Sequence, residues 1–186
     1  MPLLIAHNAR PCDAKQVSGS RISCAYLLIL IIICFISITG LRSPALAEPV
    51  ISVTLNNANT QLKLTRSMLS DMPTTSYTTS TVWTEEENTY TGILLYDFLE
   101  ALSVDMTQEN GQVVFRALDN YKAILPFSYI DRSAPMIAFL RDGAALSRRS
   151  QGPFWLIWPY DLSSRYRTET IYALSIWHIV SLDVEF

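Results

Sequence analysis

Cysteine is absent from everything after residue 34 of this 186-residue chain, because its three cysteines are Cys12, Cys24 and Cys34. The remaining residues therefore offer no disulfide, no nucleophilic thiol and no thiolate ligand for a metal. His178 is the only histidine after residue 47. A single histidine without a neighbouring cysteine or second histidine forms no recognisable zinc site.

Basic residues are also scarce. After residue 47 the chain has ten Lys and Arg residues against 16 Asp and Glu residues, a net charge near −6. No basic stripe is present that could neutralise the phosphates of a nucleic acid. Nucleic acid is therefore excluded as an expected partner.

The motifs of several common enzyme classes are missing as well. The six glycines are scattered singly, so no glycine-rich phosphate loop is present. No G-x-S-x-G nucleophile motif occurs. The most concentrated carboxylates are Glu85, Glu86 and Glu87, and their acidic turn is typical of a solvated hairpin loop without raised pKa values.

The long hydrophobic run of the chain is residues 22–39, which follow Arg10, Lys15 and Arg21. The sequence Ala45-Leu46-Ala47 comes shortly after it. This order is typical of a secretory signal peptide, so we expect residues 1–47 to be removed by cleavage after Ala47 and the protein to be periplasmic. An uncleaved membrane anchor is the alternative, because the run is just long enough to span a bilayer.

Two adjacent arginines are missing from this leader. A twin-arginine signal is a separate bacterial export address, so its absence indicates the general secretory route. We therefore expect the chain to cross the membrane unfolded.

Residues 48–60 are predicted to be a linker and first strand, and residues 61–186 a single domain of ordinary size. Apolar residues alternate with polar ones in many short segments, whereas an apolar stripe at helical spacing is confined to residues 94–103. The domain is therefore predicted to be α+β, a mixed β-sheet with few helices. The remaining expectations are a short helix capped by Ser67, a strand in the threonine-rich segment 74–84, a polar loop around Arg165 and Arg167, and a final strand over 175–186.

Residues 151–161 hold the most apolar stretch of the predicted domain. A Gly-Pro turn opens it, residues 154–158 are apolar or aromatic, and Pro159-Tyr160-Asp161 closes it. So short an apolar run between turn signals is better interpreted as a buried strand than as a helix.

This stretch stands in a fixed order with two others, residues 117–121 before it and residues 175–178 after it. Together they resemble the oxidoreductase molybdopterin-binding domain, which has the fold of the sulfite oxidase catalytic core. The resemblance covers residues 62–186. It implies a sulfite-oxidase-like fold, and in cofactor-bearing members it implies a molybdopterin cofactor and redox chemistry. Such members are typically loaded in the cytoplasm and exported folded through the twin-arginine route.

The resemblance also implies positions for the groups that hold the cofactor. A cysteine thiolate binds molybdenum in cofactor-bearing relatives, and its place falls near Val82, Trp83 or Thr84. An arginine after the Gly-Pro turn corresponds to Trp155, and a lysine on the last strand to Trp177. An indole has one N–H donor and no charge, so we expect no cofactor to be retained, although molybdopterin stays possible by resemblance.

All four tryptophans lie at or beside these positions. They are interpreted either as ordinary core that fills a vacated cavity or as the lining of a smaller pocket for a planar ligand. His178, which shares a face of the predicted last strand with apolar residues, is most simply a core histidine, and Arg148 a solvated loop charge. The candidate pocket residues are Trp83, Asp119, Asn120, Arg148, Trp155, Trp158, Tyr160, Asp161, Trp177 and His178.

The expected function is therefore that of a module binding a small planar ligand or an envelope protein partner. The alternative is a working molybdopterin-dependent oxidoreductase of the sulfite oxidase type. Membrane association is expected only if the leader is not cleaved.

Overall fold

The computed structural model describes residues 47–55 and 60–186. Residues 1–46 of the predicted leader, including its apolar segment 22–39, lie outside the described residues. Within the described part of the chain, no helix combines the length and the apolar character needed to cross a membrane.

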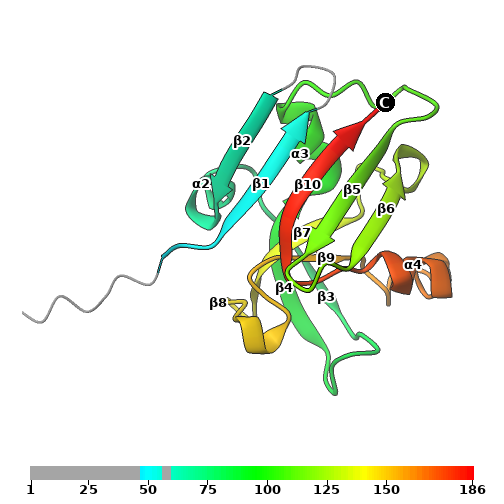
Figure 1. The fold of residues 1–186 in the computed structure, drawn as a ribbon. Coiled ribbons are helices and arrows are strands. Elements are labelled where there is room, and N and C mark those ends of the chain that lie inside the picture. Colours follow the sequence, from blue (N-terminus) through cyan, green and yellow to red (C-terminus); the bar gives the residue numbers. More distant parts are fainter. Residues whose placement is uncertain (1–46, 56–59) are drawn as a thin grey trace, which may run out of the picture. The chain divides into compact units, whose positions relative to one another are not determined.

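The first of two sheets is mixed: β1 (Val50–Leu55) and β10 (Ile179–Glu185) pair in parallel, while the other pairs of neighbouring strands in this sheet are antiparallel. The strand order is β2-β1-β10-β5-β6, so the first and last strands of the described chain are neighbours in the sheet (Figure 1). The strands are β1 (Val50–Leu55), β2 (Thr60–Thr65), β5 (Gln112–Ala117), β6 (Lys122–Pro126) and β10 (Ile179–Glu185).

The second sheet is antiparallel throughout, with the order β3-β4-β7-β8 and with β9 added to β7. Its strands are β3 (Thr75–Thr79), β4 (Asn88–Leu94), β7 (Met136–Arg141), β8 (Ala144–Ala145) and β9 (Trp155–Ile157). All three residues of β9 are fully buried, which confirms the predicted buried strand in the central stretch.

The described helices are short: α2 (Arg66–Ser70), α3 (Leu95–Ala101) and α4 (Glu169–Leu174). The predicted helix near residues 94–103 is confirmed as α3, whose Leu95, Phe98 and Leu99 are buried. The predicted cap of α2 was wrong by two residues, because the hydroxyl of Thr65 rather than Ser67 accepts the hydrogen bond from the Met68 amide. Figure 1 shows α4 beside the lower end of β6.

The α+β fold class with few helices is confirmed. Three boundaries differ from the prediction. The threonine-rich strand ends at Thr79, so Trp83 lies in a loop. The last strand begins at Ile179 rather than at residue 175, and the predicted polar loop contains α4.

Two glycines are required by close backbone approaches. A Cβ on Gly92 in β4 would lie 2.1 Å from the carbonyl oxygen of Ile137 in β7. A Cβ on Gly152, which opens the central stretch, would lie 2.2 Å from the carbonyl oxygen of Leu146. Both contacts are with backbone atoms, so the neighbouring backbone segments would have to move apart to accept a side chain.

We therefore expect Gly92→Ala to destabilise the fold by about 1–3 kcal/mol, the usual cost of overpacking. The measurement is thermal or urea unfolding. Gly143→Asn is the control, because Gly143 has open space around it at φ 76°, and Asn tolerates the left-handed region. Equal melting temperatures for Gly92→Ala and the parent would contradict the close approach.

Candidate ligand-binding cleft

Strand β9 is bonded along both of its edges. Met136, Ile137 and Ala138 of β7 pair with it on one side. On the other side the Leu156 amide donates to the Ile176 carbonyl at 2.8 Å, and Trp155 forms an isolated bridge with Trp177. The segment before β10 is thereby held against the central strand, and the Trp155 and Trp177 rings lie 6.2 Å apart at right angles.

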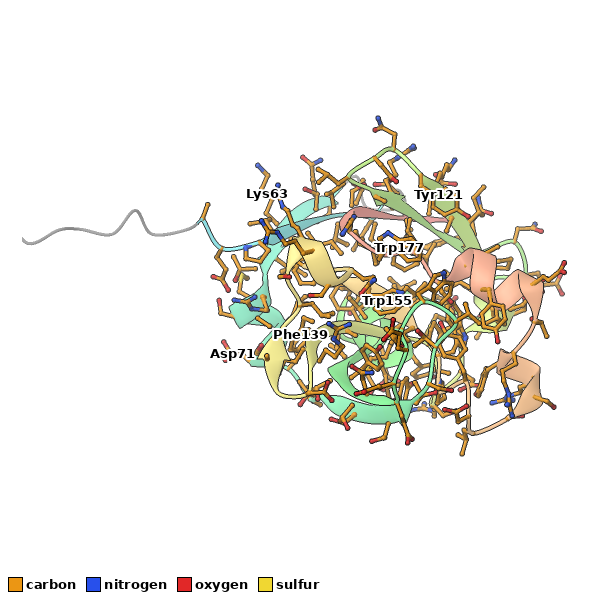
Figure 2. The ribbon with its side chains drawn as sticks, turned by 90° about the horizontal axis from the view of Figure 1, so that it is seen from below. Lys63, Asp71, Tyr121, Phe139, Trp155 and Trp177 are labelled. Atoms are coloured by element: carbon orange, nitrogen blue, oxygen red, sulfur yellow. The ribbon has the colours of Figure 1, made fainter. Side chains whose placement is uncertain are left out.

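Trp83 reaches the same place from the loop between β3 and β4. Its ring centroid lies 5.5 Å from that of Trp177 and 5.7 Å from those of Trp155 and Tyr172. All these contacts are edge to face, the arrangement that the quadrupoles of aromatic rings favour. Figure 2 shows Trp155 and Trp177 close together, with Tyr121 beyond Trp177.

Asp161 ties down the loop that carries Trp83. Its carboxylate accepts hydrogen bonds from the Ser80 amide, from the Ser80 hydroxyl and from the Thr79 hydroxyl, while its own amide donates to Thr79. The hydrogen bonds from Ser80, first that of its backbone N–H, lower the pKa of Asp161. The hairpin of β3 and β4 is thus attached to the end of the central stretch.

A cleft of about 230 Å³ opens beside these rings. Four of the side chains that line the cleft are aromatic, and the one charged side chain of the lining is that of Asp119. The lining residues are Trp83, Ala117, Asp119, Tyr121, Tyr172, Ala173, Ser175, Ile176 and Trp177.

A buried polar chain supports the floor of the cleft. The Tyr160 hydroxyl donates to the Ser175 hydroxyl at 2.7 Å, which donates in turn to the Ile171 carbonyl of α4 at 2.7 Å. The Trp155 Nε1–H donates to the Ser175 carbonyl at 3.3 Å. Burial raises the pKa of Tyr160, so its hydroxyl stays protonated and remains a donor.

The structure brings half of the predicted pocket residues together. Trp83, Asp119 and Trp177 line the cleft, while the rings of Trp155 and Tyr160 pack directly against Trp83 beneath it. Trp155 and Tyr160 are almost completely buried, so they serve as floor and core rather than as exposed contacts.

The other predicted residues do not line this cleft. Asn120 occupies the β5–β6 turn at φ 67°, and the Asp161 carboxylate is engaged with Ser80. Trp158 lines a second, more polar hollow together with Asp131 and Arg165, whose side chains are 3.1 Å apart. Arg148 is exposed, and its backbone carbonyl faces the His178 ring.

The predicted place of His178 on the core face of the last strand was wrong. His178 precedes β10 at φ 53°, is half-buried, and its Nε2 lies 2.8 Å from the Arg148 carbonyl. The left-handed backbone turns the chain between Trp177 and β10. No pattern of apolar residues signals such a turn when the residue is not glycine.

Sequence reasoning missed Tyr121 and Tyr172 as cleft residues. Tyr121 was part of a recognised segment but not of the candidate pocket, and its hydroxyl donates to the Ala173 carbonyl at 3.0 Å. Tyr172 lies on the unpredicted helix α4. The available signal was Thr168, which caps α4 by accepting from the Ile171 amide, followed by Glu169 in the first turn.

One buried polar atom beside the cleft lacks a hydrogen bond. The Tyr90 hydroxyl is buried without a hydrogen-bond partner among the described residues, and its ring packs on Trp155 at 5.4 Å. Burial raises the pKa of Tyr90, against the opposing effects of the nearby Thr84 hydroxyl and Arg141 guanidinium. An unpaired buried hydroxyl costs about 1–3 kcal/mol.

The donor set at this place does not fit a molybdenum centre of the kind that the resemblance implies. Val82 is an exposed aliphatic side chain, Trp83 supplies an indole, and the hydroxyl of Thr84 is engaged with Thr81. Trp155 fills the position expected for an arginine, and its one N–H is already bonded to Ser175. In the described residues no group of three or more His, Cys, Asp or Glu side chains is placed to hold a metal ion.

Comparison with known proteins supports the fold but not a specific family. No family model and no curated protein sequence matches the chain. Solved structures do match, among them the sulfane dehydrogenase SoxCD from Paracoccus pantotrophus, at 16% identity and a TM-score of 0.51. The match covers 73% of this chain and 38% of the SoxCD chain. This likeness supports a distant molybdopterin-oxidoreductase-like fold.

The hydrogen bonds that the Asp161 carboxylate accepts from Thr79 and Ser80 are expected to make the stability of the fold depend on pH. The pKa of the Asp161 carboxyl is lower in the folded than in the unfolded protein, where it is about 3.9. The charged carboxylate therefore stabilises the fold fully at a pH above the unfolded pKa, and this stabilisation is lost as the pH falls through the folded pKa. We expect Asp161→Asn to melt below the parent at pH 7, with the difference vanishing in acid. Melting curves from pH 7 to pH 2 test this expectation.

Asp71→Asn is the matched control, because the exposed Asp71 carboxylate has no hydrogen bond or ion pair with the described residues. A constant difference between Asp161→Asn and the parent at all pH values would contradict the role of the carboxylate charge.

Proposed function

We propose that this chain is an exported binding protein that has a molybdopterin-oxidoreductase-like fold, carries no molybdopterin and holds a small planar ligand in the aromatic cleft. The observation that carries the proposal is the convergence of Trp83, Tyr121, Tyr172 and Trp177 on one open cleft. Aromatic walls with few polar points are typical of small-molecule sites.

The proposal that the cofactor is absent rests on donor chemistry. A thiolate is the soft, anionic ligand on which metal tuning depends in the relatives that the sequence resembles, and the chain has no cysteine after residue 34. Losing a charged hydrogen-bonded contact costs about 1.5–3 kcal/mol, and the resemblance implies that indoles stand in place of two such contacts.

Export is part of the same proposal. The charged start, the apolar segment 22–39 and Ala45-Leu46-Ala47 support a signal peptide that ends at Ala47 and a periplasmic location. An envelope protein partner is the other occupant that the exposed cleft could accept.

A second candidate is a molybdopterin-dependent oxidoreductase of the sulfite oxidase type. The observation in its favour is the structural likeness to a sulfane dehydrogenase. At 16% identity the structural likeness indicates a shared fold alone, because one fold can hold many different active sites and function depends on the residues of the site.

Metal and pterin analysis separates these two candidates. The full chain is expressed with its leader in a bacterium that makes molybdopterin, and the periplasmic protein is purified. We expect an intact mass beginning at Glu48, with molybdenum and fluorescent pterin oxidation products far below one per chain. Near-stoichiometric molybdenum would establish the oxidoreductase and overturn the binding proposal.

Tryptophan fluorescence tests the cleft directly. We expect benzamide, nicotinamide or adenine to change the emission, because Trp83 and Trp177 line the site. The change should shrink in Trp177→Phe and persist in Trp158→Phe, since Trp158 is equally aromatic but lies outside the cleft. If no planar compound changes the emission of the parent or of Trp155→Phe, the binding proposal is overturned and the tryptophans are ordinary core.

A further inference from the structure

The charge at the cleft is negative, and the larger side chains that line it are aromatic. Two tryptophans and two tyrosines line it with the Asp119 carboxylate, and no lysine, arginine or histidine is among its lining residues. The face of an aromatic ring carries negative potential and attracts cations within about 6 Å of its centre. Walls of this composition are therefore unfavourable for an anion and favourable for a cation.

The rings stand at large angles to one another. Trp83 is inclined by 70° to Trp177 and by 88° to Tyr172. Their centroids are 5.5 Å and 5.7 Å apart, so the rings are in direct contact and form one angled aromatic surface beside the cleft. A rounded cation seated in the angle of this surface can contact more than one ring, whereas a flat ring can stack on only one.

Asp119 provides a free negative charge at this cleft. Its Oδ1 accepts from the Tyr121 amide at 3.0 Å, which fixes the β5–β6 turn. Its Oδ2 has no hydrogen bond or ion pair with any described residue, and the side chain is exposed. No ion pair among the described residues involves this carboxylate.

We infer that the cleft binds an organic cation, namely a quaternary or methylated ammonium group small enough for about 230 Å³. The aromatic walls contact the alkylated nitrogen, and Asp119 supplies the counter-charge. The net charge of −6 after residue 47 favours the approach of cations in the same direction. The inference rests on the proposed function in that both need a binding site at this cleft, and it replaces the planar ligand of that proposal with a rounded cation.

Calorimetric titration of the purified periplasmic protein tests the charge requirement. The probes are choline and 3,3-dimethylbutan-1-ol, its neutral counterpart with carbon in place of the charged nitrogen. We expect choline to bind roughly tenfold more tightly, as a partly desolvated cation–π contact predicts. Its affinity should also fall as salt is added, because screening weakens the attraction to an exposed carboxylate.

Asp119→Asn isolates the carboxylate without breaking the turn, because the asparagine Oδ1 can still accept from the Tyr121 amide. Choline affinity should fall about fivefold, the factor for one unit charge at about 4 Å in a water-like medium, with the alcohol unaffected. Asp105→Asn is the matched control: Asp105 accepts from the Thr107 amide in the same geometry, away from the cleft. An equal loss in both variants would assign the effect to net charge and overturn the inference.

The remaining outcomes separate the two proposals. Equal binding of choline and the alcohol, or binding of neutral planar compounds without choline, overturns the cationic ligand while the binding cleft stands. Binding of none of these compounds overturns both. Trp83→Leu keeps an apolar wall but removes a ring, so it should weaken choline more than the alcohol, with thermal unfolding confirming that the variant is folded.

Discussion

The rest of the structure depends on the way in which β9 satisfies its backbone. A fully buried strand must find partners for its N–H and C=O groups on both edges. Strand β7 supplies one set, and the segment before β10 supplies the other through Ile176 and Trp177. The path of the chain after α4 is thus fixed by the hydrogen bonding of the central strand. The contact between Trp155 and Trp177 follows from this constraint.

Two further ties convert that contact into a cleft. The chain from Tyr160 through Ser175 to the Ile171 carbonyl holds α4 against the end of the central stretch. The Asp161 carboxylate holds the loop that carries Trp83. Segments far apart in the sequence therefore place their aromatic rings in one cluster, and each ring is positioned by a hydrogen bond that belongs to the fold.

Much of this architecture was predictable because it follows from side-chain periodicity. Alternating segments became strands, and the apolar stripe of residues 94–103 became α3. Helix α4 escaped prediction because its six residues bury only Ile171 and Leu174, too few to show a period. The start of β10 escaped it because residues 175–177 are apolar enough to resemble a strand, while the turn at His178 depends on a backbone angle.

The candidate site was predictable to the extent that it depends on rare residues. Tryptophans stand out in a sequence, and Trp83, Trp155 and Trp177 do lie together. Tyr172 joins them only through tertiary packing of an unpredicted helix. Trp158 was grouped with the others because it lies beside the positions that the resemblance implies, but it lines a different hollow from Trp177.

Several polar groups at and beneath the cleft already form hydrogen bonds within the protein, so they are not free to bind a ligand. The Trp155 N–H is bonded to the Ser175 carbonyl, and the hydroxyls of Tyr121 and Ser175 donate to backbone carbonyls. The indole N–H groups of Trp83 and Trp177, the Tyr172 hydroxyl and the Asp119 Oδ2 form no hydrogen bond with the described residues. Besides these few hydrogen-bonding groups, shape and charge are the two criteria by which such a site selects a ligand. A compact cation satisfies both criteria, whereas a polyanion such as a pterin phosphate would meet negative potential and find no arginine or lysine among the lining residues.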